Sequence, residues 1–349
     1  MLQRLEPRVR YAETDDGVSI AFTSIGSGPP LVLLPTVPFG FFELEWEIPE
    51  YRAFFEALAG TVQLVQYDAR GNGLSQRDAN DFSVDALLRD LDAVVQRLHL
   101  DRFALFGLFN GSAVALAYAA QHPASVSHLV LWSAFARGQL GQADPQTQAL
   151  LSLIERDWSL FTETAAAAWM GWLPEQAARR VARGFRASVR PETARAMLDA
   201  ATRIDLTPQL ATISAPTLVL HRTAIPLDIA GPTEIVERMP NARLELLEGE
   251  SANPYIGDWR HVVRTVLEFY IGSAGVETTD NVSPLTQGLT PREVQVLRSL
   301  AGGDSNQEIA ANLGLSVHTV ERHIANIYRK IGARGRADAT AYALRHGIA

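Results

Sequence analysis

Residues Phe103 to Ala113 read FALFGLFNGSA, and this stretch decides how the first part of the chain folds. It opens with apolar residues that match a buried strand, and a turn follows in which Gly107 and Gly111 stand on either side of three residues. Small and apolar residues then continue to Gln121, as in a buried helix. A strand, a sharp turn and a helix in direct succession indicate a parallel sheet covered by helices.

The same alternation continues on both sides of this stretch, which predicts an α/β fold with both faces of the sheet covered. The expected strands are Val18–Ser24, Leu31–Leu34, Val62–Tyr67, Phe103–Phe106, Val126–Trp132, Thr217–His221 and Arg243–Leu246, and the expected helices are Arg52–Leu58, Val84–Leu98, Gly111–Gln121, Pro232–Arg238 and Asp258–Tyr270. Between residues 136 and 210 the pattern becomes helical and rich in alanine and arginine, without strands. We interpret it as a helical cap.

Three phrases make this part of the chain resemble the α/β-hydrolase fold. They are YDARGNGLS at Tyr67–Ser75, the stretch at Phe103–Ala113, and APTLVLH at Ala215–His221. The resemblance covers most of residues 1–272 and implies a doubly wound, mostly parallel sheet with a helical cap. It also implies a nucleophile elbow, G-x-S-x-G, between a strand and a helix.

The chain departs from this family at each catalytic position. Phe109 stands where the elbow should carry serine, and a phenyl ring has no nucleophilic atom. At the position of the family's acid the chain has Ala224 or Ile225, with Asp228 slightly later. Ala252 matches the family's histidine, and His261 falls too late. The sequence therefore predicts no catalytic residues and no enzyme activity. The alternative is a hydrolase with relocated residues, such as Ser112, that carries the C-terminal segment as a tail.

A pocket that has lost its reactive atoms suggests binding of a small, largely apolar ligand. The resemblance implies a donor pair from Asn110 and either Thr36 or Val37. Aromatic side chains of the cap and of the strand ends would form the floor, wall and lid of this pocket. The alternative is that these aromatic side chains are simply the core of the cap. The predicted ligand-binding residues are Thr36, Val37, Phe109, Asn110, Trp132, Trp158, Trp169, Trp172, Ala252 and Tyr255.

The C-terminal residues carry a second pattern, that of several short helices. Ser305 and Glu308 form a capping box, Ser316 is a candidate cap for the next helix, and Gly314 marks a tight turn. Apolar residues recur at helical spacing, and two short helices joined by a tight turn are typical of a helix-turn-helix. The segment 289–349 has a formal charge of +3, whereas the whole chain has a net charge of −8. The remainder of the chain therefore carries a charge of −11. A basic unit on an acidic body is typical of a DNA-binding module.

This segment resembles the LuxR/NarL-type helix-turn-helix family along its whole length. The matching pieces are LTPRE at 289–293, SNQEIA at 305–310 and TVERH at 319–323. The family implies four helices, the third of which reads the major groove of double-stranded DNA. Carried over by position, Glu321, Arg322 and Ala325 would face base edges. The residues expected near phosphates are Ser305, Asn306, Ser316, Thr319, Asn326, Arg329 and Lys330.

Composition sets the remaining bounds. The chain has 349 residues and no cysteine, which excludes disulfides and cysteine metal sites. No signal peptide or membrane span is evident, so we expect a cytoplasmic protein without metal or cofactor. The expected organisation is a ligand-sensing domain at 1–272, a linker at 273–286 and a DNA-binding domain at 287–349. We expect a homodimer on a two-fold operator, controlled by a small-molecule effector. A dimerisation scaffold without a ligand is a further alternative.

Overall fold

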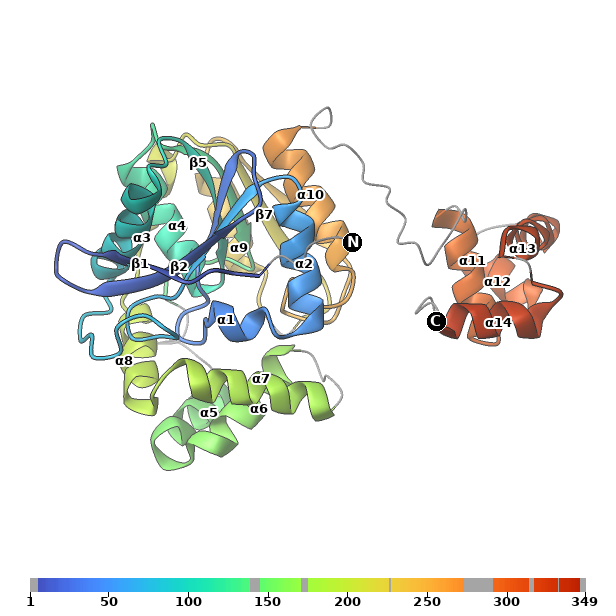
Figure 1. Ribbon diagram of the computed structural model, residues 1–349, viewed down its shortest axis with the longest axis horizontal. Helices are drawn as coiled ribbons and strands as arrows, with labels where there is room; N and C mark the ends of the chain where they lie inside the picture. Colours follow the sequence, from blue (N-terminus) through green and yellow to red (C-terminus); the bar gives the residue numbers. More distant parts are fainter. Residues whose placement is uncertain are drawn as a thin grey trace. The chain divides into compact units, whose positions relative to one another are not determined.

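The computed structural model describes residues 6–138, 145–170, 175–225, 227–272, 291–313, 317–331 and 333–345. The chain divides into two compact units, Met1–Gly275 and Val276–Ala349 (Figure 1). The predicted linker at 273–286 lies outside the described residues.

An eight-stranded sheet forms the centre of the first unit, in the order β1-β2-β4-β3-β5-β6-β7-β8. The first two strands pair antiparallel, and β2 also pairs antiparallel with β4, whereas the pairs from β4 to β8 are parallel. The strands are β1 Arg10–Glu13, β2 Ser19–Ile25, β3 Pro30–Leu33, β4 Gln63–Tyr67, β5 Phe103–Leu108, β6 Val126–Trp132, β7 Thr217–Arg222 and β8 Ala242–Leu247. The predicted α/β-hydrolase architecture is therefore confirmed, while β1 was not foreseen.

Helices cover both faces of the sheet (Figure 1). α2 and α10 pack together on one face, and α3 and α4 on the other. Successive side chains of β5 point to opposite faces of the sheet. Leu105 belongs to the main hydrophobic cluster, whereas its neighbours Ala104 and Phe106 lie outside that cluster. The helices are α1 Phe42–Glu45, α2 Pro49–Ala59, α3 Val84–Leu98, α4 Asn110–Gln121, α9 Ala230–Arg238 and α10 Trp259–Ile271.

Four further helices lie between β6 and β7 and form the cap, at the lower edge of Figure 1. They are α5 Pro145–Arg156, α6 Trp158–Met170, α7 Glu175–Ser188 and α8 Pro191–Ala201. The cap is tied to the loop after β4, because Gly73 N donates to Ser188 O at 2.8 Å and Arg77 Nη2 to Ala187 O at 2.7 Å. None of the helices in the described part of the chain combines the length and apolar character needed to cross a bilayer.

The second unit contains four helices among its described residues, α11 Pro291–Ala301, α12 Asn306–Leu313, α13 Val317–Ile331 and α14 Arg336–Arg345. Their shared core contains Val296, Leu297, Leu300, Ile309, Ala310, Val320, Ile327, Ala339 and Ala343, each at most 5% exposed. Arg336 joins two of the helices, since its Nη2 donates to Leu300 O and to Asp304 O at 2.7 Å. The turn residues Gly314, Leu315 and Ser316 lie outside the described residues.

Candidate functional site

The turn between β5 and α4 keeps the backbone of a nucleophile elbow without the nucleophile. Phe109 is the one residue between the two elements, and it adopts φ 48° and ψ −118°. Positive φ is uncommon for a bulky side chain and costs of order 1–3 kcal/mol. The turn is fixed at both ends, because Phe109 N donates to Trp132 O and Ser112 N donates to Phe109 O, each at 3.0 Å.

The two glycines of the elbow are required by close approach. A Cβ on Gly107 would lie 2.7 Å from Ser112 Cα, and a Cβ on Gly111 would lie 2.8 Å from Pro35 O. Ser112 Cα and Pro35 O are both backbone atoms, so neither can make room without a shift of the main chain. The elbow is therefore sterically complete, and Phe109 stands at its central position.

The loop after β3 is fastened to the elbow. Asn110 Nδ2 donates to Val37 O at 3.0 Å, and Thr36 O accepts from Phe39 N and Gly40 N at 2.6 Å. Asn72 Nδ2 donates to Pro38 O from the loop after β4. The structure thus brings together four of the predicted ligand-binding residues, Thr36, Val37, Phe109 and Asn110, at the carboxyl ends of β3 and β5.

A buried arginine occupies the region where a hydrolase would hold its acid and histidine. Arg222 ends β7 and is 2% exposed. Its Nη1 donates to Ser251 O and Asn253 O at 2.8 and 2.9 Å, and its Nη2 donates to Ile256 O at 2.7 Å. Burial lowers the pKa of its guanidinium. The Arg222 guanidinium therefore holds the loop between β8 and α10 in place through hydrogen bonds to three of the loop's backbone carbonyl groups.

Packing explains why Arg222 fits there. Its Cζ lies 5.2 Å from the centre of the Trp132 ring, a cation–π geometry. A Cβ on Gly249 would lie 2.8 Å from Arg222 Cδ, so glycine makes room for the side chain. Trp132 Nε1 donates to Ala252 O at 2.7 Å and adds a further tie to the same loop. Sequence reasoning missed Arg222, although a charged residue at the end of a buried strand was visible.

The candidate relay residues have separate structural roles. Asp228 is exposed and accepts from Ala230 N at 2.8 Å, before α9. His261 lies in the first turn of α10, where its N donates to Asp258 Oδ1 at 3.2 Å. Ser112 is 0% exposed, and its hydroxyl donates to Gly107 O at 2.9 Å. Ser112 is therefore buried next to the elbow, with its hydroxyl bound to the backbone.

An aromatic cluster connects the cap to the loop after β3. Phe39 stacks on Phe185 at 4.4 Å and on Trp158 at 6.4 Å, and Trp158 stacks on Phe161 at 5.4 Å. Phe39, Phe161 and Phe185 are buried, and Trp158 is half-buried. Trp158 is thus the predicted lid residue that the structure brings to the loop after β3. The side chain of Trp169 and all of Trp172 lie outside the described residues.

Trp132 and Tyr255, two of the predicted wall residues, are buried among other side chains. Trp132 is 0% exposed, between Arg222 and the loop that contains Ala252, which is itself 3% exposed. Tyr255 is 4% exposed and packs at 5.0 Å or less from the rings of Tyr51, Phe54 and Phe55. The sequence indicates the strand end or loop in which each ring lies, whereas tertiary packing determines the direction in which the ring points.

In the second unit, the predicted base-reading residues share the exposed surface of α13. Glu321, Arg322 and Ala325 are exposed, while Thr319 and Asn326 are half-buried. The capping box of α12 is confirmed, because Ser305 N donates to Glu308 Oε2 at 2.7 Å and Glu308 N to Ser305 Oγ at 3.3 Å. Hydrogen bonds to the Glu308 carboxylate from the Ser305 backbone N–H and from the Ser305 side chain lower the pKa of Glu308.

The two cationic residues expected near phosphates, Arg329 and Lys330, already have protein partners. Lys330 Nζ lies 2.6 Å from Glu293 Oε2, and the Glu293 side chain is only 4% exposed. Arg329 Nη2 donates to Asn326 Oδ1 at 2.7 Å. Lys330 therefore neutralises a buried carboxylate of α11. Ser316 lies outside the described residues, whereas Ser305 is exposed and Asn306 half-buried before and at the start of α12.

Comparison with known proteins agrees with this geometry. Residues 29–252, more than half of the chain, match the family described as alpha/beta hydrolase fold. The chain belongs to the α/β-hydrolase fold family. Residues 287–343 match the family of bacterial regulatory proteins named luxR, so the second unit is a LuxR-type DNA-binding domain.

Two curated relatives are each similar to part of this α/β-hydrolase protein. Response regulator Rre1 of Synechocystis is 36% identical over 86 residues, which are 25% of this chain and 36% of that protein. The AB hydrolase superfamily protein YisY of Bacillus subtilis is 31% identical over 129 residues, which are 36% of this chain and 45% of that protein. The chain thus spans less than half the length of these curated relatives.

Solved structures resemble the hydrolase unit in fold. An esterase from Exiguobacterium antarcticum has a TM-score of 0.66 and 20% identity, over 76% of this chain and 100% of its own. A bromoperoxidase from Bacillus anthracis has a TM-score of 0.65 and 19% identity, over 75% of this chain and 99% of its own. At such identities the likeness establishes the fold alone.

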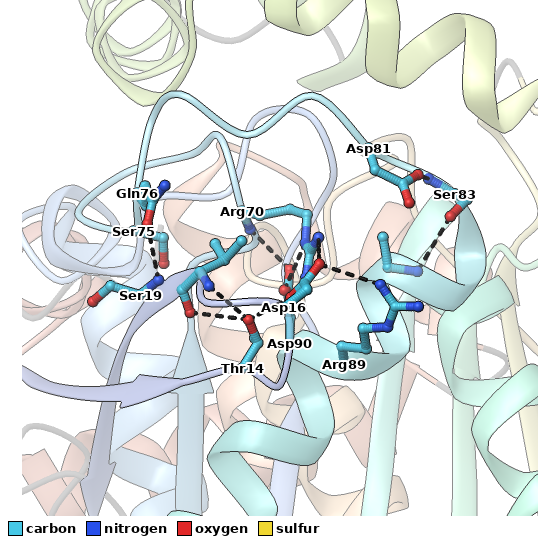
Figure 2. A network of polar contacts seen from close by, with 12 residues as sticks. Thr14, Asp16, Ser19, Arg70, Ser75, Gln76, Asp81, Ser83, Arg89 and Asp90 are labelled. Carbon is cyan, nitrogen blue, oxygen red and sulfur yellow. Dashed lines mark hydrogen bonds and ion pairs between the residues drawn. The ribbon is translucent and has the colours of Figure 1, made fainter.

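A polar network fastens the amino-terminal hairpin of the hydrolase unit to its centre (Figure 2). Arg70 is 1% exposed, and its Nε donates to Asp90 Oδ1 while its Nη1 donates to Asp16 Oδ2, both at 2.8 Å. Arg89 reaches the same Asp16 at 3.3 Å. The hydrogen bonds from Arg70 stabilise the charged form of Asp16 and hold its pKa well below the usual value. The network fixes the loop on which the cap rests.

Two other carboxyl groups of this unit, those of Asp68 and Glu45, lie in a poorly solvated environment. Asp68 is 0% exposed and accepts from Phe42 N and Leu74 N at 2.9 and 2.8 Å. Burial nevertheless raises the pKa of Asp68 to about 7, and burial together with the Asp68 charge raises the pKa of Glu45 to about 8. Glu45 lines a cavity of about 10 Å³ with Thr36, Gln66 and Tyr255, which is room for one water molecule.

Proposed function

We propose that this chain is a transcription regulator whose hydrolase unit binds a small, largely apolar ligand and does not hydrolyse it. The observation that carries the proposal is Phe109, which replaces the nucleophile on an elbow whose backbone is otherwise intact. A further support is Arg222, which occupies the region of the acid and histidine. In serine hydrolases, loss of serine or histidine alone lowers turnover on the order of a millionfold.

Ligand binding is proposed at the surface formed by Phe109, Asn110 and the loop at Thr36 and Val37, under the cap residue Trp158. Such sites lie at the carboxyl ends of parallel strands. The effector would change the arrangement of two copies of the chain and thereby the spacing of two recognition helices on a two-fold operator. Arg322 of each copy would contact guanine, and Glu321 and Ala325 would lie beside it.

The test measures DNA affinity with and without a ligand. An operator is first selected from random DNA with the full chain, and fluorescence anisotropy then gives its dissociation constant. A panel of esters, lactones and small aromatics is screened by thermal shift, and each binder is added to the DNA titration. We expect at least one binder to change the DNA affinity fivefold or more. Binders that all leave the affinity unchanged would contradict the proposal.

A hydrolase with relocated residues is the competing function, and it has less support. Its candidate nucleophile Ser112 is 0% exposed and donates its hydroxyl to Gly107 O. Turnover of acyl esters that disappears in Ser112→Ala, with unchanged folding, would favour the hydrolase.

A further inference from the structure

A second cavity lies within the cap, and it shares no residue with the elbow or the aromatic cluster. Its volume is about 140 Å³, and it opens between α5 and α8. A cavity of similar size, about 150 Å³ and lined by aliphatic and aromatic side chains, holds a benzene molecule. The lining residues are Gln148, Leu151, Ile154, Arg195, Leu198, Asp199 and Thr202.

The lining is divided between an apolar floor and a polar rim. Leu151, Ile154 and Leu198 are 8%, 1% and 5% exposed, so the floor is part of the cap core. On the rim, Arg195 Nε lies 3.0 Å from Asp199 Oδ1, and both side chains remain partly exposed at 40% and 46%. The cavity therefore offers apolar surface beneath a neutral pair of opposite charges.

This charge pair selects the polar group of a ligand. A carboxylate on the ligand would be drawn to Arg195 but repelled by Asp199, and an ammonium group would meet the reverse. A carboxamide carries an acceptor and a donor without net charge, so it can satisfy both side chains and leave no charge unpaired. The apolar floor then takes a ring or a short hydrocarbon chain.

The cavity lies between α8, which is packed against the loop after β4, and α5. A Cβ on Gly71 would lie 2.9 Å from Met197 Cε and 3.0 Å from Thr193 Cγ2, so α8 packs closely on the loop after β4. Arg70 of that loop belongs to the buried network in Figure 2. α5 supplies the opposite wall with Leu151 and Ile154. A molecule in the cavity would contact both helices.

We propose that the cavity between α5 and α8 is a binding site for a small neutral carboxamide with an apolar ring or chain. The site is separate from the elbow, and the proposal does not depend on whether the elbow binds a ligand.

The test uses three probes that share one ring, namely benzamide, benzoate and benzylamine. Ligand-observed NMR titration with the full chain measures their dissociation constants. We expect benzamide to bind at least fivefold more tightly than the two charged probes. Asp199→Asn removes the repelling charge and should reverse the order between benzamide and benzoate. Absence of benzamide binding, or equal binding of all three probes, overturns the proposal.

Blocking variants locate the site. Leu151→Trp fills the cavity, and Thr202→Trp obstructs it from the end of α8, so each should weaken benzamide binding at least tenfold. Ser152→Trp is the matched control, because Ser152 lies on the exposed side of the same helix. Circular dichroism melting identifies the blocking variants that fold, and either one suffices for the test. Benzamide binding that survives in a folded blocking variant refutes the location.

Discussion

Replacement of Arg222 by methionine should destabilise the hydrolase unit strongly. The variant keeps most of the aliphatic volume but removes three donors, so the carbonyl groups of Ser251, Asn253 and Ile256 lose their partner. A hydrogen bond from a charged donor contributes about 1.5–3 kcal/mol. Removal of a buried cation also removes its desolvation penalty, which offsets part of this loss. The expected net decrease in the free energy of unfolding is about 3–5 kcal/mol.

The measurement is urea unfolding followed by tryptophan fluorescence. All six tryptophans lie between residues 46 and 259, so the signal reports the hydrolase unit alone. Arg243→Met is the matched control, because Arg243 also lies over an aromatic ring, Phe269 at 5.5 Å, but is exposed on the neighbouring strand. We expect the control to change stability by less than about 1 kcal/mol. An Arg222→Met variant as stable as the control would refute the assigned role of Arg222.

Four further predictions follow from the same structure. Under the proposed function, Phe109→Ser should leave p-nitrophenyl acetate turnover at background, because Ala252 stands where the family's histidine is expected and cannot activate a serine; a burst of nitrophenol would contradict this. The free energy of unfolding should fall between about pH 4 and 8, because the raised folded-state pKa values of Glu45 and Asp68 confer stability that is fully present below about pH 4 and is lost as the pH rises through those values. Glu45→Gln should flatten the profile in urea titrations, and an unchanged slope would count against the assignment. Lys330→Met should remove the ion pair between Lys330 and Glu293 and destabilise the LuxR-type domain by about 1.5–3 kcal/mol, measured by amide hydrogen exchange in α11 and α13 with Arg329→Met as the control; equal protection in both variants would argue against it. Arg322→Ala should weaken operator binding by about 1–3 kcal/mol and relax the preference at one base pair, while a uniform loss on all sequences would indicate a phosphate contact.

The sequence was sufficient to predict the sheet and the elbow, because local features determine them. Gly107 and Gly111 mark positions where a side chain has no room, and the apolar runs mark strands buried on both faces. The α12 capping box was predictable for the same reason, since Ser305 and Glu308 are three residues apart.

The parts that sequence reasoning missed depend on contacts between distant residues. Arg222 binds carbonyl groups 29 to 34 positions further along the chain, and no local pattern indicates that pairing. Trp132 and Tyr255 were assigned to a ligand wall because each ends a strand or lies in a loop at the right edge. The direction of a ring is set by tertiary packing, which placed both in the core.

The most direct test of the central claim is exposure of the full chain to a fluorophosphonate, which reacts covalently with activated serines, followed by mass spectrometry. The structure predicts no adduct, because Phe109 holds the elbow and Ser112 is enclosed behind it. A stoichiometric adduct on any serine of the hydrolase unit would contradict the account.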